Sequence, residues 1–150
     1  MSETNVWKPD DRIIAASEKL KKDFPFMQNT WCGFGYGWFD LVRELCEKIT
    51  AVYAEAGLEP DIVVLTVEEK YGTLRFEWGG DAQMTDEWDN DEAYRAAYSA
   101  AYEKITALAS EYEDKSETVC EKCGRSGMIY NVNDWYTCLC DDCLEKEQRK

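Results

Sequence analysis

The most informative absence in this 150-residue chain is histidine, of which there is none. Histidine is the usual general base for serine and cysteine nucleophiles and a common ligand of catalytic zinc. Its absence excludes Ser-His-Asp and Cys-His catalysis as well as histidine-based zinc hydrolases. Cys32 and Cys46 therefore lack an activating base, and we expect both thiols to be packed rather than nucleophilic.

The sequence also lacks any apolar run long enough to span a bilayer. Its N-terminus, MSETNVWKPDDR, has neither the positive start nor the apolar stretch of a signal peptide. Seven cysteines without a secretory signal favour metal binding in a reducing compartment over disulfide formation. We therefore expect a cytoplasmic protein with no membrane partner.

Basic segments are missing too. The formal net charge is −14, from 17 basic and 31 acidic residues. Residues 81–115 carry 3 basic and 10 acidic side chains, and residues 116–150 carry 5 and 7. Proteins that bind a phosphate backbone usually present a basic patch, so direct nucleic-acid binding is disfavoured. The acidity is compatible with mimicry of nucleic acid, and equally with simple solubility.

What the chain does contain is enough apolar and aromatic content, 45% and 13%, to bury a core. Apolar residues at helical spacing predict a first helix over 9–25 and a second that begins near Trp38 and stops at Gly57. A third helix is predicted within 81–116, after an acidic linker near 79–92.

Residues 61–80 predict a β-hairpin around the turn sequence EEKYG. We expect the alternating apolar residues of both strands to face one core layer; these are Val63, Leu65, Val67, Leu74, Phe76 and Trp78. The predicted fold class is therefore α+β, with three helices packed on a hairpin over residues 1–116. A zinc-ribbon module is predicted to follow over residues 117–150.

The module is predicted from its cysteines. Cys120-x2-Cys123 and Cys140-x2-Cys143 lie 16 residues apart, within the spacing of four-cysteine zinc sites. Each pair presents two thiolates to one ion, and the sequence MIYNVNDWYTCL between them is typical of strand, turn and strand. Four protein ligands leave no open position, so one structural Zn²⁺ is expected.

Two alternatives stay open for these cysteines. Cys138 competes for the fourth ligand position, although Cys140 with Cys143 closes the better chelate. The cysteines are also compatible with a reduced, metal-free structural role.

Two surfaces are candidates for binding a partner. The first is an aromatic, glycine-rich loop over 24–40, in which most aromatics are expected in the core, while Trp31, Phe34 and Tyr36 are candidate anchors. The second is the acidic run Asp86, Glu87, Asp89, Asp91 and Glu92, which is otherwise explained as a solvated helix N-terminus.

Three stretches resemble a family of small uncharacterised proteins encoded by bacteriophages and prophages. They are GYGWFDLVRELCEKI (35–49), VEEKYGTLRFEW (67–78) and VCEKCGRSGMIYNVNDWYTCLCDDC (119–143). Two departures are visible: Cys143 stands where relatives often have histidine, and TCLC replaces TLC, which makes Cys138 resemble an insertion. The resemblance implies a phage protein acting in the host cytoplasm, and it supplies no activity for the family.

These observations favour a non-enzymatic, zinc-stabilised protein that binds and inhibits a host or anti-phage-defence protein. Nucleic-acid mimicry by the acidic residues is one version of this hypothesis. The alternatives are a nucleic-acid-binding zinc ribbon, acting as a transcription or replication accessory factor, and an enzyme dependent on carboxylate-bound metal. The oligomeric state is not predicted.

Overall fold

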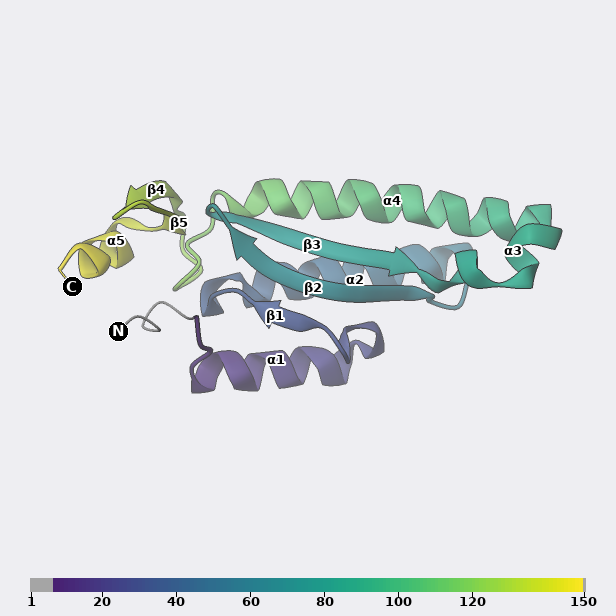
Figure 1. Ribbon diagram of the computed structural model, residues 1–150, viewed down its shortest axis with the longest axis horizontal. Helices are drawn as coiled ribbons and strands as arrows, with labels where there is room; N and C mark the ends of the chain where they lie inside the picture. Colours follow the sequence, from purple (N-terminus) through teal and green to yellow (C-terminus); the bar gives the residue numbers. More distant parts are fainter. Residues whose placement is uncertain (1–6, 150) are drawn as a thin grey trace.

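The computed structural model describes residues 7–149 and shows an elongated α+β arrangement (Figure 1). The helices are α1 (Asp11–Asp23), α2 (Phe39–Ala56), α3 (Asp86–Asn90), α4 (Glu92–Ser116) and α5 (Asp141–Gln148). The strands are β1 (Trp31–Gly33), β2 (Ile62–Lys70), β3 (Thr73–Gly80), β4 (Met128–Val132) and β5 (Trp135–Leu139). Short 3₁₀ helices occur at η2 (Pro25–Met27), η3 (Tyr36–Trp38) and η4 (Asp81–Met84). The mixed fold class is confirmed.

The first two helices begin and end where their local sequence signals lie. Asp10 caps α1 by accepting a hydrogen bond from the Ile13 backbone N–H at 2.9 Å. Gly57 follows α2 with φ of 68°, the left-handed conformation that glycine adopts without steric cost. The long α4 is capped by Asp91, which accepts from the Tyr94 N–H.

The central sheet has the strand order β1-β2-β3, with β1 parallel to β2 and β2 antiparallel to β3. Figure 1 shows α2 behind this sheet, α4 along one side and α1 along the other. Buried residues of α2, α4 and the inner sheet face share one hydrophobic core, which includes Leu45, Ile49, Leu74 and Ile105.

The prediction that Val63 and Leu65 of β2 face the core is wrong. Val63 is 37% exposed and Leu65 is 57% exposed, whereas Val64 and Val67 are buried. The pairing of β2 with β3 shifts register between Val64 and Thr66, so one extra residue interrupts the alternation. A bulge of this kind is not visible in a simple period-two pattern.

The acidic stretch before α4 is helical rather than an irregular linker. Thr85 caps α3 by accepting from the Trp88 N–H at 3.3 Å, and the Arg95 guanidinium donates to the Trp88 carbonyl at 2.6 Å. The Trp88 ring stacks on Tyr102 with ring centroids 6.1 Å apart. The Trp88 side chain therefore packs against the core and anchors this segment, while the carboxylates of the segment are exposed.

A partly buried acceptor, Asp61, joins the open end of the hairpin to the helices. Asp61 accepts hydrogen bonds from the Tyr53 hydroxyl at 2.8 Å, from the Ala82 N–H at 2.8 Å and from the Tyr102 hydroxyl. Tyr53 is fully buried, so its hydroxyl has no access to water if this acceptor is lost.

Asp61→Ala is therefore expected to lower the free energy of unfolding by about 3 kcal/mol, because buried donors lose their partner. Chemical denaturation measures this change. Asp81→Ala is the matched control, since Asp81 is an exposed carboxylate that begins η4, the 3₁₀ helix that contains Ala82. Equal destabilisation by both variants would contradict a specific role for Asp61.

Candidate metal centre

The four cysteines of the two C-x-x-C pairs come together in space. The Sγ atoms of Cys120, Cys123, Cys140 and Cys143 all lie within 4.8 Å of one another. The Sγ atoms of Cys123 and Cys140 are 3.6 Å apart. Four sulfurs around a tetrahedral ion at a bond length of about 2.3 Å lie about 3.8 Å from one another. The cluster therefore has the donors and the dimensions to hold a metal ion.

Local backbone geometry places each pair. The Cys120 N–H donates to the Arg125 carbonyl at 2.7 Å, and the Gly124 N–H donates to the Cys120 carbonyl at 2.9 Å. Gly124 has φ of 85°, which allows the chain to turn tightly around the first two sulfurs. The second pair begins at Cys140, which is the N-cap residue of α5.

The hairpin β4–β5 connects the two pairs. Its turn is formed by Asn133 and Asp134, both with positive φ, as the sequence NVND indicates for a two-residue hairpin loop. Helix α5 is an addition that sequence reasoning did not predict. Its N-terminus places the Cys143 N–H 3.5 Å from the Cys140 sulfur, and this hydrogen bond lowers the pKa of Cys140 to about 7. The hydrogen bond thus stabilises the thiolate of Cys140, the form that binds metal, whereas burial raises the pKa values of Cys123 and Cys143.

Cys138 takes no part in the cluster. Neighbouring residues of a strand point to opposite faces, so Cys138 enters the main core while Leu139 packs beside Cys120 and Cys140. The Cys138 thiol donates to the Glu117 carbonyl at 3.3 Å, and burial raises its pKa to about 12. The cluster that could hold a metal therefore consists of the other four cysteines of the module.

The cysteine cluster is docked on the start of α2. The Gly37 N–H donates to the Glu121 carbonyl at 2.7 Å, and the Gly35 N–H donates to the Glu121 Oε2 at 2.9 Å. The Trp38 indole N–H donates to the Val119 carbonyl at 2.8 Å. Burial and the nearby Glu69 carboxylate raise the pKa of Glu121 to about 7.

Sequence reasoning missed this docking, although the GFGYG stretch carried a signal for it. A Cβ atom on Gly37 would lie 2.2 Å from the Cys120 carbonyl oxygen and 2.4 Å from the Gly124 nitrogen. Only glycine allows the two backbones to approach this closely. Ile129 and Cys138 of the predicted zinc-ribbon module also pack in the main core. The division of the chain into a core domain ending at residue 116 and a module beginning at residue 117 therefore stays a prediction.

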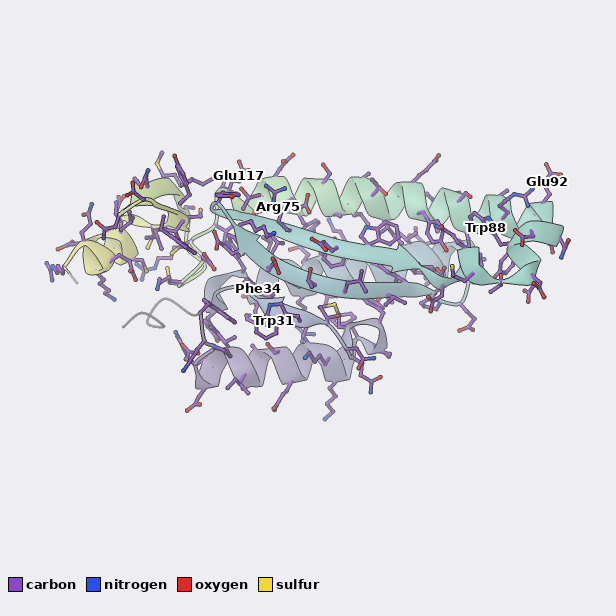
Figure 2. All side chains as sticks on the ribbon, in the orientation of Figure 1. Trp31, Phe34, Arg75, Trp88, Glu92 and Glu117 are labelled. Atoms are coloured by element: carbon purple, nitrogen blue, oxygen red, sulfur yellow. The ribbon has the colours of Figure 1, made fainter. Side chains whose placement is uncertain are left out.

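The three aromatic candidates separate in the structure. Phe34 is fully buried, so its prediction as a partner-binding residue is corrected to a core role; its ring packs on Phe39 at 4.4 Å. Trp31 is 52% exposed and Tyr36 is 41% exposed. Trp31 lies on β1, a strand within the expected loop, where Cys32 takes the inward position (Figure 2).

The acidic candidates lie at the opposite end of the molecule from the cysteine cluster, where Figure 2 labels Trp88 and Glu92. Asp86, Glu87, Asp89, Asp91 and Glu92 are all exposed. Among residues 7–149, the four cysteines form the only group of three or more potential ligands with close donor atoms. The acidic run therefore gathers no metal site of its own.

No helix within the described residues combines the length and apolar character needed to cross a membrane. Comparison with protein-family models, with curated proteins and with solved structures finds no significant match to this chain. Its function is therefore inferred from the site and from the sequence.

Proposed function

We propose that this chain is a non-enzymatic, zinc-stabilised protein that binds another protein. The observation that carries the proposal is the closed cluster of Cys120, Cys123, Cys140 and Cys143. Four thiolate ligands satisfy a tetrahedral ion and leave no position for a substrate or an activated water. The metal would then hold a module in place rather than perform chemistry.

Zinc is favoured over an iron–sulfur cluster by the dimensions of the site. The 3.6 Å separation of the Cys123 and Cys140 sulfurs suits two ligands of one ion, whereas a cluster holds its cysteines around several irons. The small hydrophobic cluster beside the site contains only Cys120, Leu139 and Cys140 as buried residues. Such a core is too small to order the module without a metal.

The proposed partner is a host or anti-phage-defence protein, and the proposed effect is inhibition, in line with the resemblance to phage-encoded proteins. The exposed carboxylates of α3 support nucleic-acid mimicry as one mode of action. Direct binding of nucleic acid is disfavoured because two basic residues of the module are already paired. Lys122 pairs with Glu147 at 2.9 Å, and Arg125 pairs with Asp142 at 3.1 Å.

Native mass spectrometry of the full chain is expected to show one zinc ion per protein. The zinc-loaded protein, immobilised on a resin, is expected to retain a specific protein from a lysate of infected host cells. A zinc-free protein would overturn the metal assignment. Salt-dependent affinity for DNA or RNA, without any retained protein, would favour a nucleic-acid-binding module instead.

A further inference from the structure

A broad groove separates the cysteine module from the N-terminal part of the core. Its volume is about 800 Å³, within the usual size of ligand-binding sites. We call it the aromatic groove because exposed rings of Trp7, Trp31, Tyr36 and Trp135 line it. These rings come from the segment before α1, from β1, from η3 and from β5, so only the folded chain assembles them.

The exposure of these rings is unusual for a surface that contacts only water. Trp135 is 64% exposed and Trp31 is 52% exposed, and Trp7 meets Trp31 edge to face at 5.7 Å. Tryptophan and tyrosine are the residues most enriched at the energetic centre of protein interfaces. One guanidinium already stacks here, because the Arg12 side chain lies 4.4 Å above the Tyr36 ring centre.

The charges of the groove favour a cation as the incoming group. Its cations are Lys8, Arg12 and Lys122, and its carboxylates are Asp10, Glu68, Glu69, Glu121 and Glu147. Arg12 pairs with Asp10 at 3.9 Å and Lys122 pairs with Glu147 at 2.9 Å, so most of the positive charge is already matched.

Two carboxylates of the groove stay without an ion pair among the described residues. Glu69 accepts the Gly72 backbone N–H at 2.7 Å, and Glu121 accepts the Gly35 N–H at 2.9 Å and the Thr137 hydroxyl. Burial and the adjacent Glu68 carboxylate raise the pKa of Glu69. A guanidinium between an indole face and Glu69 would gain both a cation–π contact and a charge-assisted hydrogen bond.

We propose that the aromatic groove binds an arginine-bearing segment of the partner protein, held by Trp31, Trp135 and Glu69. Arginine fits better than lysine because its planar guanidinium stacks on an aromatic ring while donating to a carboxylate. This inference rests on the proposed function as a protein-binding protein and assigns the site of contact to the groove rather than to the acidic residues of α3.

Fluorescence anisotropy with a labelled glycine–serine peptide that contains two arginines tests the proposal on the zinc-loaded full chain. The arginine peptide is expected to bind, with affinity that falls at high salt. The same peptide with citrulline, a neutral isostere of arginine, is expected not to bind. Equal binding of the citrulline peptide, absence of binding by the arginine peptide, or preference for a neutral oligosaccharide overturns the proposal.

Trp135→Ala and Glu69→Gln are each expected to weaken peptide binding by about threefold to thirtyfold. Trp135→Phe is expected to retain part of the affinity, since a smaller aromatic face remains. Glu87→Gln is the matched control because it makes the same charge change on α3, far from the groove (Figure 1). A loss with Glu87→Gln equal to that with Glu69→Gln would show that only net charge matters and would overturn the site.

The failure of this inference is distinguishable from the failure of the proposed function. If a captured partner binds the Trp31→Ala, Trp135→Ala double variant as tightly as the unchanged protein, the groove is excluded while protein binding stands. If the chain holds no zinc, the metal part of the proposed function fails independently of the peptide result.

Discussion

Replacing Cys120 by serine is expected to abolish stoichiometric zinc binding and to unfold residues 117–149. Cys120 is fully buried and is one of the four clustered cysteines, so its replacement leaves only three thiolates for a tetrahedral ion. Structural zinc contributes about 10 kcal/mol to the folding of small modules, so this is the largest single loss expected in the chain. Native mass spectrometry measures the zinc content, and hydrogen exchange measures the unfolding segment by segment.

Cys138→Ser is the matched control for this experiment. It replaces a thiol by a hydroxyl in the same module, but at a residue whose side chain lies in the main core. Serine can keep the hydrogen bond that the Cys138 thiol donates to the Glu117 carbonyl. Zinc is therefore expected to stay bound, and loss of zinc from this variant would contradict the ligand set.

Gly37→Ala is expected to have the second-largest effect, although Gly37 lies outside the module. The added Cβ would meet the Cys120 carbonyl oxygen at 2.2 Å and the Cys123 nitrogen at 2.8 Å, and backbone atoms cannot rotate away. We expect the free energy of unfolding to fall by about 3 kcal/mol, at the upper end of overpacking costs. Zinc affinity, measured by competition with a chelator, is expected to fall with it because the cysteine turn must shift.

Gly79→Ala is the control for Gly37→Ala, since a Cβ on Gly79 meets nothing within 4 Å. We expect Gly79→Ala to leave the zinc affinity unchanged. A Gly37→Ala protein with unchanged stability and zinc affinity would show that the module does not dock on the start of α2. It would also remove the groove, one wall of which is formed by this docking.

Residues near one another in the chain made much of this structure predictable. Helical periodicity located the ends of the first helix to within a few residues, and Gly57 marked the end of the second. The two C-x-x-C pairs identified the ligand cluster, because each pair is a complete two-sulfur chelate within four residues. The chelate argument also left Cys138 out of the predicted set, and the structure places its side chain in the main core rather than in the cluster.

Interactions between distant residues decided the rest. The register shift at Leu65 depends on how β2 pairs with β3, and the burial of Phe34 depends on which aromatics the core has room to accept. Neither the loop around Gly37 nor the cysteine turn indicates alone that the two meet, because the contact joins residues more than eighty positions apart. The sequence by itself determined the first two helices, the hairpins and the candidate ligand cysteines, which follow from local spacing. The tertiary structure alone decided where the module docks and that four exposed rings share one groove, because these features depend on packing between distant segments.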